Sequence, residues 1–357
     1  MNKKILQDYT LEELKTELEE YNIPKFRYEQ IQRWCYEYAN ILDMSNLPLE
    51  LREKLNENYT SNPVTIEKEF ISKDGTRKFL LRLQDGNLIE CVLMQYKYGN
   101  TICVSTQVGC RMGCSFCASG IDGLERNLSA GEILSEVLCI NKYMGGTIED
   151  RKITNIVLMG SGEPLDNYDN VVKFIRLVSL PKMINISQRN ISLSTCGIAP
   201  KIKKLADEDL TITLTISLHS SNDEHRKTIM KIANAYSLDD LMESIRYYFK
   251  KTNRRVVFEY IMLEDNTKYP DALRLKHLLS GISSHLNLIP VNATANGTKG
   301  ISKDRQTKFW EHLKKVGITA TTRLTLGSDI EGACGQLKRR YQGEEKCLKL
   351  LEFQAHF

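Results

Sequence analysis

A chain of 357 residues, 41% of them hydrophobic, can bury a substantial core and form either one large domain or a core with an accessory domain. Ten cysteines, an opening MNKKILQDYT without an apolar signal segment, and no apolar run long enough to span a bilayer argue against a secreted, disulfide-stabilised or membrane protein. The formal net charge of +4 permits an RNA partner without requiring one. We therefore expect a cytoplasmic protein.

Residues 1–62 are expected to form a small helical accessory domain. Thr10 and Glu13 have the spacing of a capping box ahead of LEELKTEL, and the helical segments KFRYEQIQRWCYEYA and LPLELREKL follow. Several basic and aromatic side chains here suit either packing or contact with RNA, and both alternatives stay open: Lys25, Arg27, Tyr28, Arg33 and Trp34.

Residues 63–98 are expected to form a β-meander. Its three segments, VTIEKEFI, RKFLLRL and LIECVLMQ, are rich in β-branched and apolar residues, and Asp-Gly turn signals separate them. From Thr101 onward, strand-like segments alternate with helix-compatible sequence. The strand-like segments are TICVST, ITNIVLM, NISLST, TITLTISL, RVVFEYIM and HLNLIP.

This alternation predicts a parallel sheet, and six units predict an open barrel rather than a flat sheet. We therefore predict an α/β fold with a partial (β/α)6 barrel over residues 99–329. The helical domain and the β-meander precede the barrel, and a tail over residues 330–357 follows it. In such barrels the functional side chains collect at the carboxyl ends of the strands.

Three cysteines follow the first barrel strand in the order Cys-x-x-x-Cys-x-aromatic-Cys, at Cys110, Cys114 and Cys117, with Phe116 in the aromatic position. Three thiolates on one short loop can ligate three irons of a 4Fe-4S cluster and leave the fourth iron open for chemistry. The pattern resembles the signature of radical S-adenosylmethionine (SAM) enzymes, in which the open iron chelates SAM and a 5′-deoxyadenosyl radical is released. Two other interpretations remain open: a zinc site completed by a distant ligand, and small buried side chains.

Polar residues also stand at the ends of the other predicted strands. The second strand ends in a glycine turn in which Gly162 and Glu163 could meet the ammonium group of SAM, and this turn resembles the Gly-Gly-Glu-type site of radical SAM enzymes. Hydroxyl, imidazole and amide groups at later strand ends suit the carboxylate, ribose and adenine of SAM. Each alone is more often bonded to backbone. These candidates are Ser194, Ser217, Leu218, His219 and Asn292.

Three longer stretches resemble the RlmN/Cfr family of RNA methyltransferases, and the likeness covers nearly the whole chain. They are CVSTQVGC at 103–110, GEPL at 162–165 and DIEGACGQL at 329–337. The resemblance implies methylation of an adenine ring carbon in 23S rRNA at the peptidyl transferase centre, and in RlmN-like members also of the tRNA adenosine 3′ of the anticodon. It implies a 4Fe-4S cluster and SAM as cofactors, with two SAM molecules used per turnover.

The resemblance also implies roles for three side chains. Cys334 takes a methyl group from one SAM as a thiolate nucleophile, and a radical made from the second SAM activates that methyl group for addition to the adenine. Glu90 stands at the position of the family's base, which removes the ring proton. Cys103 matches the cysteine that resolves the protein–RNA adduct through a transient disulfide with Cys334. Without the resemblance, Glu90 reads as a solvated strand residue, Cys103 as a core residue and Cys334 as an ordinary free thiol.

Pro164 and Val108 resemble the RlmN-like members, which act at C2, whereas Cfr-like members tend to carry alanine and cysteine there. We therefore expect C2 methylation. One alternative is a Cfr-like C8 methyltransferase that confers antibiotic resistance, and another is a non-catalytic RNA-binding protein with a structural metal. The expected partners are 23S rRNA, tRNA and an electron donor such as flavodoxin or ferredoxin, and we expect a monomer.

Overall fold

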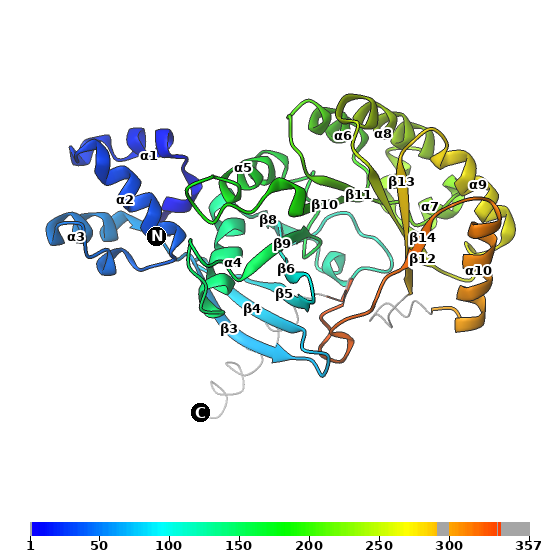
Figure 1. Ribbon diagram of the computed structural model, residues 1–357, viewed down its shortest axis with the longest axis horizontal. Coiled ribbons are helices and arrows are strands. Elements are labelled where there is room, and N and C mark those ends of the chain that lie inside the picture. The colour runs from blue at the N-terminus through cyan, green and yellow to red at the C-terminus, as the bar shows by residue number, and fades with distance from the viewer. Residues whose placement is uncertain (1, 291–299, 334, 337–357) are drawn as a thin grey trace, which may run out of the picture.

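The computed structural model describes residues 2–290, 300–333, 335 and 336. A group of short helices lies at one end of the molecule (Figure 1). Its main elements are β1 (Lys4–Ile5), α1 (Leu11–Glu17), α2 (Lys25–Tyr36), α3 (Leu49–Asn58) and β2 (Tyr59–Thr60). The Thr10 side chain accepts from the N–H of Glu13, and the Glu13 side chain accepts from the N–H of Thr10, so the predicted capping box at the start of α1 is present. Leu14, Ile31 and Leu55 belong to a small hydrophobic core of this group.

A ten-stranded sheet forms the rest of the framework, in the order β14-β13-β12-β11-β10-β9-β6-β5-β4-β3. Strands β3, β4, β5 and β6 pair antiparallel, whereas β6, β9 and all later strands pair parallel to their neighbours. The strand bounds are β3 (Val64–Ile71), β4 (Arg77–Leu83), β5 (Leu88–Tyr96), β6 (Gly99–Cys103), β9 (Ile153–Leu158), β10 (Ile191–Thr195), β11 (Thr213–Ser217), β12 (Val256–Met262), β13 (Ser284–Pro290) and β14 (Ala320–Thr322).

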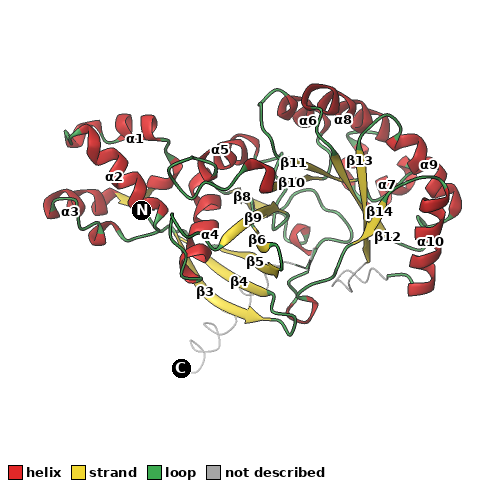
Figure 2. Ribbon diagram, in the orientation of Figure 1, coloured by secondary structure: helices red, strands yellow, loops and turns green. Residues whose placement is uncertain are grey.

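Helices cover the outer face of the curved parallel part of the sheet (Figure 2). In α5 the residues Val171, Phe174 and Val178 are buried at helical spacing, which gives this helix the apolar face that packs onto the strands. None of the helices in the described ranges is long and apolar enough to cross a membrane. The helix bounds are α4 (Ala130–Tyr143), α5 (Tyr168–Val178), α6 (Ala199–Ala206), α7 (Asp223–Ile229), α8 (Leu238–Thr252), α9 (Tyr269–Leu279) and α10 (Lys303–Lys315).

The structure confirms the predicted α/β fold and adds three features to it. The β-meander is continuous with the barrel sheet, because β5 pairs with β6 and places Val92 opposite Cys103. A seventh parallel strand, β14, extends the far edge beyond β13. A further pair, β7 (Gln107–Gly109) and β8 (Leu124–Asn127), brackets the cysteine segment on both sides.

Candidate active site

The carboxyl ends of the parallel strands surround a cavity of about 170 Å³. The three cysteines of the loop after β6 line it together with residues that follow β9, β10 and β11. Parallel strands all end at the same edge of a sheet, so residues far apart in the sequence meet here. The sequence candidates on this wall are Cys110, Cys114, Cys117, Gly162, Glu163, Ser194, Ser217 and His219.

Main-chain hydrogen bonds hold the cysteine loop at three points. The N–H of Cys110 donates to the carbonyl of Gly123 at 2.9 Å, and the N–H of Ser115 donates to the carbonyl of Ile229, at the end of α7, at 3.0 Å. The N–H of Ala118 donates to the carbonyl of Gly335 at 2.8 Å. Burial raises the pKa of the Cys110 thiol to about 12 and raises the pKa of the Cys114 thiol further. Burial therefore favours the neutral form of both thiols.

The turn after β9 contains glycines because other backbone lies against it. A Cβ atom on Gly160 would be 2.6 Å from the Val104 carbonyl oxygen, and Gly162 has a φ of +108°. The N–H of Glu163 donates to Oε1 of Gln107 at 2.9 Å. The buried Glu163 carboxylate accepts from the N–H of Cys196 at 2.8 Å and from that of Leu165 at 3.0 Å. Burial raises the pKa of Glu163, and these hydrogen bonds oppose that shift. The carboxylate thus fixes the turn against the end of β10.

His219 is a buried imidazole on the cavity wall with a φ of +57°. Burial lowers its pKa to about 3, so the ring is neutral near pH 7. Its Nδ1 accepts from the N–H of Ile261 at 3.2 Å, which assigns the proton to Nε2. The ring packs edge-on against Phe116 with 4.8 Å between ring centroids. Leu218 differs from its neighbours, since it is fully buried and does not line the cavity.

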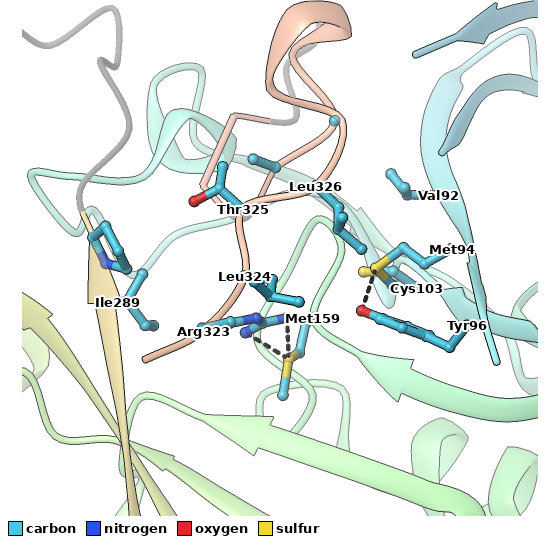
Figure 3. A pocket seen from close by; sticks show the side chains of 13 residues that line it. Val92, Met94, Tyr96, Cys103, Met159, Ile289, Arg323, Leu324, Thr325 and Leu326 are labelled. Atoms are coloured by element: carbon cyan, nitrogen blue, oxygen red, sulfur yellow. Dashed lines mark hydrogen bonds between the residues drawn. The ribbon is translucent and has the colours of Figure 1, made fainter. Parts of the chain in front are cut away.

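A second, smaller cavity of about 40 Å³ adjoins the first and is lined by Cys103 (Figure 3). Met159, Ile289 and Arg323 line both cavities, so the two spaces share a wall. Arg323 interacts with Glu259, a buried carboxylate of the first cavity, at 3.4 Å. The structure therefore brings Cys103 near the space lined by the three cysteines.

Aromatic rings stand beside the Cys103 cavity. Tyr96 lines it, and the ring of Tyr98 stacks on Tyr96 with 4.9 Å between centroids and 8° between planes. Tyr98 is 73% exposed and Leu324, another lining residue, is 75% exposed. Two large side chains, Tyr98 and Leu324, are thus open to solvent beside the cavity.

Glu90 lies on β5 and is buried, contrary to its interpretation as a solvated strand residue. Alternate residues of a strand share a face, so Glu90 is on the same face as Val92 and Met94, which line the Cys103 cavity. An Oε1 atom of Glu90 is 3.0 Å from Nζ of Lys78 on β4, and each of the two side chains is only 4% exposed. The ion pair is therefore almost fully removed from water.

The segment after β14 is attached to the turn between β3 and β4. The Ser72 hydroxyl donates to Oδ1 of Asp329 at 2.5 Å, and the N–H of Gly327 donates to Oδ2 of Asp74 at 2.8 Å. Ala333 lines the Cys103 cavity and Gly335 lines the larger one. Cys334 and Asn292, both predicted to be functional, lie outside the described residues.

Comparison with known proteins identifies the family. Residues 104–275 match the radical SAM superfamily, and residues 5–60 match the "Ribosomal RNA large subunit methyltransferase N-terminal domain". A "Probable dual-specificity RNA methyltransferase RlmN" of Clostridium botulinum (strain Alaska E43 / Type E3) is 52% identical over 95% of this chain and 97% of its own length. The protein of the same name from Clostridium perfringens (strain 13 / Type A) is 52% identical over 97% of this chain and 100% of its own. The chain belongs to the RlmN family.

The fold agrees with this assignment. The crystal structure of a radical SAM methyltransferase from Sphaerobacter thermophilus has a TM-score of 0.89 and is 39% identical, covering 94% of this chain and 99% of that one. This RlmN-family protein is therefore a radical SAM RNA methyltransferase.

Sequence reasoning missed several polar side chains that shape the site of this RlmN-family protein. Gln107 holds the Glu163 turn, and Arg323 and Glu259 stand where the two cavities meet. Arg226, on α7, is fully buried behind the strand ends. The sequence offers no local signal for the last three, because an arginine or glutamate in an amphipathic segment normally faces water.

Proposed function

We propose that this enzyme methylates C2 of an adenine in 23S rRNA and of the tRNA adenosine 3′ of the anticodon, through a methylated Cys334. The observation that carries the proposal is the pair of adjoining cavities. One is lined by Cys110, Cys114 and Cys117, and the other by Cys103 and by Ala333, the neighbour of Cys334. A site that makes a radical and a site that transfers a methyl group must be adjacent, because a radical that reaches water is lost.

The donor set of the larger cavity fits a 4Fe-4S cluster. Three buried or half-buried thiols line one space, and in the described part of the chain no three His, Cys, Asp or Glu side chains converge as they would around a single metal ion. Separate irons of a cluster suit thiolates spread around a cavity. Cys110, Cys114 and Cys117 would hold the cluster, which would supply the electron for cleavage of SAM to methionine and a 5′-deoxyadenosyl radical.

The remaining wall of this cavity suits SAM. The turn at Gly162 and Glu163 presents backbone to the amino group, and the half-buried hydroxyls of Ser194 and Ser217 suit the carboxylate or ribose. The neutral His219 ring can donate from Nε2, and burial keeps it uncharged. Asn292 completes the proposed set through the family resemblance.

Three side chains perform the chemistry on RNA in this proposal. The Cys334 thiolate accepts a methyl group from SAM and carries it to C2. Glu90 accepts the proton that C2 loses, and its ion pair with Lys78 supports the carboxylate form that a base requires. The Cys103 thiolate attacks the Cys334 sulfur, and the disulfide forms as the bond from that sulfur to the transferred carbon breaks. The electron pair of the broken bond stays with that carbon, which gains a proton and becomes the methyl group.

The position of methylation is inferred from two residues and from the relatives. Val108 and Pro164 are the RlmN-like choices, and Pro164 lines the larger cavity while Val108 is fully buried in the core beside the cysteine loop. The curated relatives carry the RlmN name and are described as dual-specificity enzymes. Both observations favour C2 over C8.

Anaerobic turnover tests the proposal. Reconstituted enzyme is incubated with SAM, dithionite and either protein-free 23S rRNA or tRNA, and the nucleosides are analysed by mass spectrometry. We expect 2-methyladenosine from both RNAs and none with Cys334→Ala. Formation of 8-methyladenosine would instead make the enzyme Cfr-like. A zinc-loaded protein that makes no 5′-deoxyadenosine would support a non-catalytic RNA-binding protein.

The proposal includes a cytoplasmic monomer that receives electrons from a flavodoxin or ferredoxin. It also includes a division into a helical domain (1–62), a β-extension (63–98), a barrel (99–329) and a tail (330–357). Light scattering of the purified protein tests the monomer, and reduction by flavodoxin in place of dithionite tests the donor.

A further inference from the structure

Ser105 is a fully buried residue whose hydroxyl joins two segments of the proposed site. It lies two residues after Cys103, where β6 ends. Its Oγ donates to the main-chain carbonyl of Glu90 on β5 at 2.8 Å, and the same Oγ accepts from the N–H of Ser161 at 3.0 Å. A hydroxyl has one hydrogen to donate and lone pairs with which to accept, so these two hydrogen bonds use it in both directions.

The hydroxyl links β5 to the chain after β6 at the point where the main-chain pairing of the two strands stops. Strands β5 and β6 pair antiparallel as far as Val92 and Cys103. The same register would place Ser105 opposite Glu90, but the N–H of Ser105 donates to Oε2 of Glu136 on α4, at 3.1 Å, instead of crossing to β5. The side chain of Ser105 therefore makes this link in place of its main chain.

The other partner of the hydroxyl belongs to the turn that faces the larger cavity. Ser161 stands directly before Gly162 and Glu163, which line that cavity. A main-chain bond also holds this turn to the segment after β6, because the N–H of Thr106 donates to the Ser161 carbonyl at 2.8 Å. The Ser105 hydroxyl extends the connection to β5. Two hydrogen bonds at one oxygen atom thus lead from the Gly162 turn to the residue proposed as the base.

Two different steps of the proposed reaction depend on the two joined segments. The Gly162 turn is proposed to bind SAM, and Glu90 is proposed to remove the C2 proton after the methyl carbon has been attached. A base acts only within hydrogen-bond reach of the proton that it removes. A misplacement of about 1 Å can lower a rate about a hundredfold. A shift of β5 relative to the turn would therefore slow proton removal more than SAM cleavage.

We propose that Ser105 is a positioning residue whose hydroxyl fixes the main chain at Glu90 against the Gly162 turn, and so holds the base in reach of C2. The inference rests on the proposed function, because it takes Glu90 as the base. It predicts that loss of the hydroxyl separates two events: SAM cleavage continues, and release of the protein–RNA adduct slows.

The first test compares Ser105→Ala with Ser244→Ala in anaerobic reactions of reconstituted enzyme with 23S rRNA. Ser244 is the matched control, because it is also fully buried and its hydroxyl also donates to a main-chain carbonyl, that of Leu241 at 2.6 Å, but it lies on α8. We expect Ser105→Ala to form 2-methyladenosine at least about tenfold more slowly, and to accumulate the adduct. Its 5′-deoxyadenosine formation and its KM for RNA should stay as in wild type. Ser244→Ala should match wild type in every measurement.

A double-mutant cycle separates positioning of the base from general damage. If Ser105 acts through Glu90, Ser105→Ala should lower the residual product formation of Glu90→Gln less than about twofold. A structural defect would instead lower it by the same factor as in the wild-type background. Equal factors in the two backgrounds, or normal product release by Ser105→Ala, would overturn the proposal.

A measurement on the wild-type enzyme decides if Ser105→Ala does not fold. Amide hydrogen exchange of the reconstituted enzyme without RNA should show the Ser161 N–H protected at least about a hundredfold relative to an unstructured chain. Exchange of that N–H as fast as in an exposed loop would overturn the proposal.

The failure of this inference differs from the failure of the proposed function. Normal product release by Glu90→Gln would mean that Glu90 is not the base, and would refute that part of the proposed function together with this role of Ser105. If wild type makes 2-methyladenosine and Glu90→Gln accumulates the adduct, the proposed function is supported. Normal adduct release by Ser105→Ala would then refute the positioning role alone.

Discussion

Replacement of Lys78 by methionine tests whether the buried ion pair keeps Glu90 ready to act as a base. Both side chains are 4% exposed and their charged atoms are 3.0 Å apart, so the variant removes from a dry site the cation that pairs with the Glu90 carboxylate. Removal of one partner of a buried pair costs about 3–5 kcal/mol when the other stays charged. Glu90 can reduce that cost by taking up a proton, since burial favours the neutral acid. A protonated Glu90 cannot remove the C2 proton.

We therefore expect Lys78→Met to lower methylation at neutral pH at least about tenfold and to recover part of it as the pH rises. Single-turnover formation of 2-methyladenosine is measured across pH, and 5′-deoxyadenosine is measured alongside to show that SAM cleavage continues. The unfolding midpoint of the metal-free protein in urea gives the cost in stability. In Lys78→Met/Glu90→Gln, where neither charge of this pair remains, stability should return while activity does not. Unchanged activity and stability in Lys78→Met would refute this account of Glu90.

Three further changes test other parts of the site. Gly162→Ala should weaken SAM binding and cost about 1–3 kcal/mol of stability, because φ is +108° and the new Cβ would lie 2.7 Å from the Gln107 Cβ. Gly86→Ala is the control for positive φ alone, because no atom lies within 4 Å of the Cβ added there. Tyr98→Ala should raise the KM for RNA several-fold with little effect on SAM cleavage, because the exposed Tyr98 ring, stacked on Tyr96, can also stack on an RNA base. Tyr98→Phe keeps the ring and should leave the KM unchanged. An unchanged KM in Tyr98→Ala would exclude this contact. Asp329→Asn should slow methylation of Cys334, because it weakens the hydrogen bonds from Ser72 and Lys73 that fix the segment before Cys334. The intact mass of the protein measures this methylation. Asp304→Asn, on α10, is the control.

The same attachment predicts a pH dependence. Bonds from the Ser72 hydroxyl and the Lys73 N–H lower the pKa of Asp329. Burial alone would raise the pKa of Asp74, but the N–H groups of Gly327 and Thr76 lower it to about 2. Both carboxylates have a folded pKa below the unfolded one, so their contribution is present above the ordinary Asp range and is lost as the pH falls toward 2. Proteolysis after residue 327 should therefore stay slow down to mildly acidic pH and accelerate only below it. Equal protease sensitivity of wild type and Asp329→Asn would contradict the attachment.

The features that the sequence predicted well are those with local causes. The capping box at Thr10, the helix that follows it and the strands from Thr101 onward each depend on residues within a few positions. The cysteine loop and the Gly162 turn could be predicted because the residues of each motif lie within a few positions of one another, in a pattern that few other kinds of site share. The strand β14 was missed because three residues, mostly exposed, give no periodic signal.

The partners of charged residues could not be predicted, because they depend on register across the sheet. Lys78 reads in RKFLLRL as one of several strand cations, and only the pairing of β4 with β5 brings it to Glu90. Arg226 reads in DEHRKTI as a solvated helix residue. Its burial follows from the side of α7 that faces the ends of β10 and β11, which no local pattern reveals.

The continuity of the sheet explains how the β-meander comes to line the Cys103 cavity. Cys103 ends the first parallel strand, and the antiparallel strand beside it carries Glu90 on the face that lines the Cys103 cavity. The turn between β3 and β4, at the outer end of the same sheet, holds Asp329 and Gly327. A continuous sheet thus sets the distance between the proposed base Glu90, the proposed resolving thiol Cys103 and the segment that leads to Cys334. An insertion of two residues in β5 between Glu90 and Val92 would keep the alternation of faces yet move Glu90 by about 7 Å along the strand. We expect such a protein to fold and to cleave SAM but to accumulate the uncleaved protein–RNA adduct, which denaturing gel electrophoresis would show; release of normal product would mean that Glu90 is not the base.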